Sequence, residues 1–200
     1  MYFKITSGLT FLYFLFYKKT FNRNSVIKIS IPQATVLGEY LAKKGSLKGS
    51  KVLELGAGTG LAGIVASKLG AEVTLTDLKK NLGILKRNID VNFNSTEPML
   101  LVKELEWNIN LENFSHQSYN LIIGADIIYS VDTFRNLLKT IYYFLSCNKT
   151  DNPPKIVLSS KLRYDRVETF NRMADKLYKL KSKLLFFEPI SQVKIYELFL

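Results

Sequence analysis

Residues 51–60 read KVLELGAGTG, and this stretch limits the possible folds of the chain more than any other. The apolar residues 52–55 predict a buried strand, and the largely apolar residues 61–70 predict a helix. The turn between them carries glycine at positions 56, 58 and 60. Because glycine has no Cβ, such a turn can bend sharply and approach a ligand closely, and the following helix offers unpaired N–H groups. The stretch therefore predicts a ligand-binding loop at the end of a strand.

The spacing of the three glycines narrows the choice of ligand. A dinucleotide fingerprint has glycine at the first, third and sixth positions, but the sixth position counted from Gly56 is Leu61. The fifth position is Gly60, and Glu54 stands two residues before the first glycine. This arrangement resembles the first motif of the seven-stranded methyltransferases that use S-adenosyl-L-methionine. A phosphate loop of the Walker type is excluded, because no Gly-Lys-Ser/Thr follows.

Asp77 is the second candidate ligand-binding residue. Residues 72–76 (EVTLT) predict a strand, and Asp77 follows at its carboxyl end, about 20 residues after the first glycine. A carboxylate at this point can accept hydrogen bonds from both ribose hydroxyls of an adenosyl group. Alternatively, Asp77 caps the helix that residues 78–92 predict. The glycine turn upstream favours the ribose.

Strands and helices alternate along the rest of the chain. Such alternation indicates an α/β fold with a doubly wound, mostly parallel sheet, to which a closing hairpin would add an antiparallel terminal strand. The expected class is a seven-stranded, Rossmann-like methyltransferase domain. Further strands are predicted at 99–105, 119–125, 156–160, 183–187 and 193–199, and further helices at 33–44, 131–146 and 165–180. Residues 26–31 alternate between polar and apolar and predict one more, half-buried strand, which Pro32 ends.

The composition sets limits on the class of protein. With 200 residues the chain predicts one domain, which we place at residues 33–200, after a divergent segment at 1–32. Cys147 is the single cysteine and His116 the single histidine, so the sequence predicts neither a disulfide framework nor a transition-metal site. A reducing, cytoplasmic location fits this cysteine content.

Two further features concern partners. The formal net charge of +11 favours an acidic partner such as nucleic acid, an acidic protein face or a membrane surface, although the lysines at 176–183 also suit the solvated face of a helix. Residues 5–17 carry no charge, but they are too few to span a bilayer, which takes about 20 residues. They also lack a signal-peptide cleavage site. We expect them to pack on the domain or to be poorly ordered, with membrane contact as the alternative.

Four candidate ligand-binding positions follow the carboxyl ends of predicted strands. They are the Gly56 turn, Asp77, Trp107 and Asp126. In a doubly wound sheet, ligands bind outside these strand ends, near the point where the strand order reverses. We therefore expect the four positions to line one crevice. Trp107 is the only tryptophan, and its indole could lie against adenine or, alternatively, serve as a core or lid residue.

The residues after the fourth predicted strand separate substrate classes. Enzymes that methylate amino groups of nucleic-acid bases carry an Asn/Asp-Pro-Pro-aromatic motif at this point, whereas this chain has DIIY at 126–129. Residues 152–155 (NPPK) are similar to that motif, but they precede the fifth predicted strand and end in lysine. The sequence therefore argues against a nucleic-acid substrate, which stays an alternative because of the positive charge.

The Asp-x-x-Tyr motif resembles one family in particular. It is similar to that of the seven-stranded protein-lysine methyltransferases that modify chaperones and elongation factors, and the resemblance extends from about residue 33 to the end of the chain. Its blocks are LELGAGTGLAGIVA at 53–66, VKELEW at 102–107 and GADIIY at 124–129. Within this methyltransferase-like 21 group, RYDR at 163–166 and VKIYE at 193–197 resemble the branch that methylates heat shock 70 kDa chaperones.

The resemblance implies a role for each candidate site residue. Asp77 would accept the ribose hydroxyls, Trp107 would lie by the adenine, and Ala125 would line the pocket. Asp126 and Tyr129 would face the incoming lysine, unless Asp126 is a strand-end cap and Tyr129 a core residue. The residues that would line the methionine and ribose part of S-adenosyl-L-methionine are Gly56, Ala57 and Gly58. No metal is implied.

The resemblance also implies partners. The substrate would be a folded protein, a heat shock 70 kDa-type chaperone. Apart from the resemblance, we expect the enzyme to be a monomer. The family has a tryptophan before its first helix that touches the cofactor, whereas Ile31 and Pro32 stand there in this chain. This departure leaves a further alternative open, a relative that binds a client protein without methylating it.

Overall fold

The computed structural model describes residues 32–93, 100–114, 118–147, 153–161 and 165–200. The strands are β1 (Lys51–Glu54), β2 (Glu72–Asp77), β3 (Leu100–Glu104), β4 (Leu121–Ala125), β5 (Lys155–Lys161), β6 (Lys181–Glu188) and β7 (Val193–Phe199). The α-helices are α2 (Pro32–Lys44), α3 (Leu61–Lys68), α4 (Leu82–Asn92), α5 (Val131–Ser146) and α6 (Arg166–Tyr178). The strand predicted at 26–31, the apolar segment at 5–17 and His116 lie outside the described residues.

The strands form one sheet in the order β3-β2-β1-β4-β5-β7-β6. Strands β1 to β5 run parallel, whereas β7 pairs antiparallel with both β5 and β6. This confirms the predicted doubly wound, mostly parallel fold with an antiparallel terminal strand, although β7 lies inside the sheet and β6 forms its edge. The strand order reverses between β1 and β4, and such a reversal leaves a crevice at the carboxyl ends of the strands.

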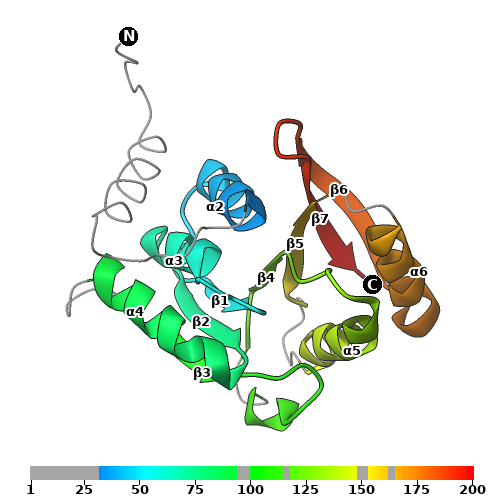
Figure 1. Cartoon of the computed structure of the whole chain (residues 1–200), viewed down its shortest axis with the longest axis horizontal. Coiled ribbons are helices and arrows are strands. Elements are labelled where there is room, and N and C mark those ends of the chain that lie inside the picture. The colour runs from blue at the N-terminus through cyan, green and yellow to red at the C-terminus, as the bar shows by residue number, and fades with distance from the viewer. Residues whose placement is uncertain (1–31, 94–99, 115–117, 148–152, 162–164) are drawn as a thin grey trace.

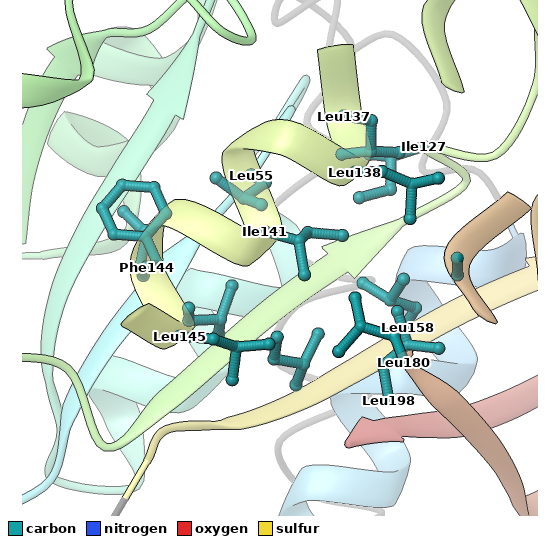
Figure 2. Packing of buried hydrophobic residues seen from close by; sticks show 14 of the residues in the cluster. Leu55, Ile127, Leu137, Leu138, Ile141, Phe144, Leu145, Leu158, Leu180 and Leu198 are labelled. Carbon is teal, nitrogen blue, oxygen red and sulfur yellow. The ribbon is translucent and has the colours of Figure 1, made fainter. Parts of the chain in front are cut away.

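Helices cover both faces of the sheet (Figure 1). Helices α2, α3 and α4 lie on one face, and α5 and α6 lie on the other. The apolar residues of α5 recur every three or four positions, so they share one helix face and pack against the sheet in a buried cluster (Figure 2). The residues of α5 in this cluster are Phe134, Leu137, Leu138, Ile141, Phe144 and Leu145. A second buried cluster fills the opposite face beneath α2 and α3, so the central strands are apolar on both sides.

Helix α4 begins later than its sequence pattern indicates. The prediction of one helix over 78–92 is wrong at its start, because Leu78 is extended, with φ −62° and ψ 147°. A short 3-10 turn at Lys79–Asn81 follows, and the α-helix begins only at Leu82. The extended residue and the 3-10 turn thus separate the end of β2 from the start of α4.

The last helix is also shorter than predicted. Residues 165–180 predict one helix, but α6 spans Arg166–Tyr178, because Lys179 adopts a left-handed conformation (φ 58°) that ends it. The following strand, β6, gains the two residues Lys181 and Ser182 at its start. No helix within the described ranges is long and apolar enough to cross a bilayer.

Candidate active site

A cleft of about 310 Å³ lies at the carboxyl ends of the parallel strands. The structure brings six predicted site residues together in its lining, from four separate strand ends. They are Gly56, Asp77, Trp107, Ala125, Asp126 and Tyr129. The carboxylates of Asp77 and Asp126 therefore belong to one cleft, as the predicted crevice requires. Its volume is in the range of small-molecule sites.

Part of the cleft wall is bare backbone at Gly56. This residue has φ 60°, a left-handed conformation that L side chains rarely adopt. A Cβ on it would lie 2.9 Å from Cγ2 of Ile127 and 3.3 Å from Cζ2 of Trp107. Glycine is thus required both by the conformation and by the space, and its backbone leaves room for a ligand beside the turn.

Asp77 joins the glycine turn to the end of β2. Its Oδ2 accepts a 2.6 Å hydrogen bond from the backbone N–H of Gly58, and its Oδ1 accepts 2.7 Å bonds from the N–H of Leu78 and the side-chain amide of Asn81. Helix α4 has Asn81 at its N-cap position and no side-chain cap, so the alternative that Asp77 caps this helix is wrong. A carboxylate accepts about four hydrogen bonds, so these three donors fix its orientation and still leave room for a ligand hydroxyl.

Glu54 supports the glycine turn from inside the core. Its side chain is 1% exposed, and its Oε2 accepts a 2.8 Å hydrogen bond from the backbone N–H of Gly63 in the first turn of α3. Burial raises the pKa of this carboxyl to about 8; the hydrogen bond from Gly63 opposes the rise, and the nearby charge of Asp77 adds to it. Glu54 therefore holds the start of α3 against β1 and does not line the cleft.

Trp107 is held in place by α5. The next residue, Asn108, has φ 69° and donates its backbone N–H to Oγ1 of Thr140 at 2.8 Å. Thr140 is fully buried on α5. The half-buried indole packs against the core cluster and also lines the cleft, with its ring centroid 6.4 Å from that of Tyr129. It therefore offers a flat apolar wall to a ligand.

Asp126 and Tyr129 lie together at the end of β4. Asp126 has φ 55°, and its backbone N–H continues the sheet by donating to the carbonyl of Ser159 at 2.9 Å. Left-handed conformations are uncommon outside glycine and concentrate at functional sites. Tyr129 is 45% exposed, so it is not a core residue, and its carbonyl accepts a 2.5 Å hydrogen bond from the guanidinium of Arg166. An acid and an exposed phenol thus both line the cleft.

The match between predicted and observed lining is incomplete. Ala57 is buried in the core and Gly58 is exposed beside Asp77, and since neither lines this cleft, their contact with a ligand stays a prediction. Thr133 and Asn136, which were not predicted as site residues, also line the cleft from α5. They stand three residues apart on one helix face, shortly after the Asp-x-x-Tyr motif, and this spacing is the signal that could have identified them. Further lining residues are Leu78, Leu105, Glu106 and Ile127.

These features suit a ligand with an adenosyl group and a methionine tail. Bare glycine backbone, a fixed carboxylate and an aromatic wall follow three neighbouring strand ends, and within the described ranges no group of three or more His, Cys, Asp or Glu residues could hold a metal ion. Together with the strand order, they define the class of S-adenosyl-L-methionine-dependent methyltransferases with a seven-stranded sheet.

Comparison with known proteins narrows this class to one family. The family model described as lysine methyltransferase matches residues 17–177, and the chain belongs to that family. Protein N-lysine methyltransferase METTL21A of Mus musculus is 42% identical over 166 residues, which cover 82% of this chain and 73% of that relative. EEF1A lysine methyltransferase 3 of Xenopus tropicalis is 41% identical over 128 residues, which cover 64% of this chain and 54% of that relative. The chain is thus a protein-lysine methyltransferase of the METTL21 group, and its cofactor is S-adenosyl-L-methionine.

Solved structures agree with the fold at low sequence identity. The T. thermophilus 16S rRNA N2 G1207 methyltransferase RsmC, in complex with AdoMet and guanosine, superposes with a TM-score of 0.61 at 16% identity, over 87% of this chain and 44% of that chain. The ribosomal protein L11 methylase of Lactobacillus delbrueckii subsp. bulgaricus superposes with a TM-score of 0.58 at 17% identity, over 84% and 78%. These likenesses support the methyltransferase fold.

Proposed function

We propose that this protein-lysine methyltransferase acts on a heat shock 70 kDa-type chaperone, and that Asp126 and Tyr129 receive the substrate lysine. METTL21A relatives from three species are 40–42% identical to the chain, whereas METTL21E relatives are 36–37% identical. In the sequence, RYDR at 163–166 and VKIYE at 193–197 resemble the branch of this group that methylates heat shock 70 kDa chaperones. The observation that carries the catalytic part of the proposal is that Asp77 and Asp126 line one cleft.

In this proposal the cofactor lies along the ends of β1, β2 and β3. Asp77 accepts hydrogen bonds from the ribose hydroxyls, Trp107 lies against the adenine, and Ala125 closes the wall beside them. The residues that carry the methionine part are Gly56, Ala57 and Gly58. When bound, S-adenosyl-L-methionine supplies a methyl group on a sulfonium with a good leaving group, so the protein mainly has to align a nucleophile with that methyl.

The residues at the end of β4 prepare the lysine. An ammonium group with a pKa of about 10.4 must lose a proton before its nitrogen can attack. The apolar walls of Leu105 and Ile127, both buried, disfavour the charged form and lower the pKa of the incoming lysine. The charge of Asp126 acts in the opposite sense, so its role is to accept a hydrogen bond and orient the amine. Tyr129 covers the amine and offers its hydroxyl as a second partner.

A methyl-transfer assay on defined substrates tests the proposal. The purified chain is incubated with tritiated S-adenosyl-L-methionine and, in turn, with a recombinant heat shock 70 kDa chaperone, elongation factor 1A or RNA. We expect label in the chaperone, on lysine by mass spectrometry, and none with Asp126→Ala. Asp90→Ala, which removes an exposed acid on α4, is the control and should keep activity. Label in RNA or in elongation factor 1A alone would contradict the chaperone assignment.

Elongation factor 1A is the second candidate substrate. The observation that favours it is the 41% identity with a relative named EEF1A lysine methyltransferase 3. We rank it second, because that match covers 64% of the chain and the METTL21A match covers 82%.

We further propose that the protein is a monomer, that it is catalytically active, and that it is located in the cytoplasm. Calorimetry with S-adenosyl-L-methionine separates it from a relative that binds a client without methylating it, because the latter would give no heat of binding at high ligand concentration. Light scattering of the purified chain should give the mass of one copy, and a larger mass would contradict the monomer.

A further inference from the structure

Tyr196 has a buried hydroxyl that the structure leaves unexplained. The residue lies in β7, opposite Leu158 of β5, and its side chain is 4% exposed in the cluster beneath α5 and α6. Among the described residues, no group meets strict hydrogen-bond geometry with its hydroxyl, although the side chain of Ser160 lies close enough to interact with it. Buried polar groups almost always have a partner, because an unpaired one loses its hydration without compensation. Since phenylalanine would fill the same space without this loss, the hydroxyl indicates a role beyond packing.

The register of the sheet brings the end of β4 near this hydroxyl. Ala125 of β4 pairs with Ser159 of β5, so Asp126 comes level with Ser160. Ser160 stands two residues after Leu158 and thus shares its face of the sheet, the face on which Tyr196 also lies. Ser160 and Tyr196 therefore share one face of the sheet, and Asp126 lies level with Ser160 just after β4, in the lining of the cleft.

The neighbours of the hydroxyl favour Asp126 as its partner. Ser160 donates its own proton to the carbonyl of Lys161 at 3.2 Å. Burial raises the pKa of Tyr196 to about 12; Ser160 opposes the rise, and the charge of Asp126 adds to it. The phenol therefore keeps its proton at neutral pH, and the one described charge that acts on it is a carboxylate of the candidate active site.

We infer that Tyr196 is a positioning residue, which donates a hydrogen bond to the carboxylate of Asp126 when a substrate lysine enters the cleft. The inference rests on the proposed role of Asp126. Tyr196 does not line the cleft whereas Asp126 does, so the hydroxyl acts on the amine through the carboxylate. A bond to one carboxylate oxygen fixes the direction of the other, which accepts from the amine. The bond also favours the ionised carboxylate, since a hydrogen bond to the charged form stabilises it.

The test compares two buried tyrosines. Tyr196→Phe removes one hydroxyl and keeps the ring, and Tyr119→Phe does the same before the amino end of β4, where the hydroxyl interacts with Thr74 far from the cleft. We expect Tyr196→Phe to lower kcat about tenfold, the loss typical of a hydrogen bond to a charged group, with an unchanged KM for S-adenosyl-L-methionine and an unchanged or higher Tm. Tyr119→Phe should lower Tm and leave kcat unchanged. A Tyr196→Phe enzyme with the kcat of wild type would overturn the inference.

A double-mutant cycle separates positioning from packing. In an Asp126→Asn background, Tyr196→Phe should cause no further loss of kcat, because its effect passes through the missing carboxylate. An equal tenfold loss in both backgrounds would contradict the inference and leave the proposed lysine methylation intact. Should the wild type methylate no protein, NMR titration of Asp126 with S-adenosylhomocysteine and a lysine analogue bound still decides. Its pKa should be higher in Tyr196→Phe than in wild type, and equal values would overturn the inference.

Discussion

Two carboxylates at neighbouring strand ends do different work in this cleft. Glu54 is buried behind the glycine turn and accepts the N–H of Gly63, whereas Asp77 accepts three donors and lies in the cleft lining. The positions of the two residues explain their different environments. Glu54 is the last residue of β1 and lies in the core before the turn, whereas Asp77 is the last residue of β2 and lies at the cleft. Glu54 therefore stabilises the turn, whereas Asp77 is placed to bind a ligand.

Asn in place of Asp77 should weaken cofactor binding. The amide keeps the size of the carboxylate but loses its charge and one acceptor oxygen, so either the N–H of Gly58 or the donors of Leu78 and Asn81 lose their acceptor. We expect Asp77→Asn to raise the Kd for S-adenosyl-L-methionine about tenfold or more by calorimetry. Asp90→Asn on α4 is the matched control. An unchanged Kd would mean that Asp77 only ties the turn to β2.

Glu54 should make stability depend on pH. Its ordinary pKa of 4.5 applies to the unfolded chain, and burial raises the pKa to about 8 in the folded state. Between these values the folded state binds more protons than the unfolded state, so the free energy of unfolding falls as pH rises from 4.5 to about 8. The total loss is on the order of a few kcal/mol.

Urea unfolding of wild type and Glu54→Gln measures this contribution. The amide can still accept the N–H of Gly63 but does not titrate, so the stability difference between the two proteins should change between pH 5 and pH 8.5. A difference that stays constant over this range would show that the carboxyl titrates at its ordinary pKa.

At the scale of elements, α5 and α6 fix the backbone of the loops that line the cleft through hydrogen bonds. Helix α5 holds the residue after Trp107 through Thr140, and α6 holds the backbone of Tyr129 through Arg166. Both helices lie on one face of the sheet, whereas the glycine turn leads into α3 on the opposite face (Figure 1). Helix α5 thus supports the proposed cofactor end of the cleft, and α6 supports the proposed lysine end.

Valine in place of Thr140 should loosen the Trp107 loop. The change keeps the shape of the side chain but leaves the N–H of Asn108 without its acceptor, which costs about 1–2 kcal/mol of stability. Because Trp107 is the only tryptophan, its fluorescence reports on the cleft directly. We expect Thr140→Val to need a several-fold higher concentration of S-adenosyl-L-methionine than wild type for half of the fluorescence change. Thr140→Ser keeps the hydroxyl and should behave like wild type. Equal half-saturation concentrations for wild type and both variants would show that the Thr140 hydrogen bond does not fix the Trp107 loop.

Alanine in place of Arg166 should affect the lysine end alone. The guanidinium donates to the carbonyl of Tyr129 and does not line the cofactor part of the cleft. We expect kcat for protein methylation to fall several-fold while the Kd for S-adenosyl-L-methionine stays the same. Arg172→Ala, on the same helix, should leave both unchanged. A loss of cofactor affinity in Arg166→Ala would argue for general disruption instead.

At the scale of the whole molecule, the doubly wound, mostly parallel sheet could be predicted because its central strands are apolar on both faces and alternate with helices. The meeting of Asp77, Trp107 and Asp126 followed from their places at strand ends. Contacts between side chains and distant backbone could not be predicted. The hydrogen bond from the N–H of Gly58 to Asp77 is one such contact. Thr133 and Asn136 offer only their spacing as a signal, because they resemble solvated helix residues in sequence.

The central claim is that one cleft contains both a binding site for the cofactor and a separate binding site for a lysine amine. The most direct measurement is the pair of Kd for S-adenosyl-L-methionine and kcat for protein-lysine methylation in Asp126→Asn. We predict a Kd within about twofold of wild type and a kcat at least about a hundredfold lower, because the reaction depends mainly on the orientation of the amine. An Asp126→Asn enzyme that methylates lysine at the rate of wild type would contradict this claim.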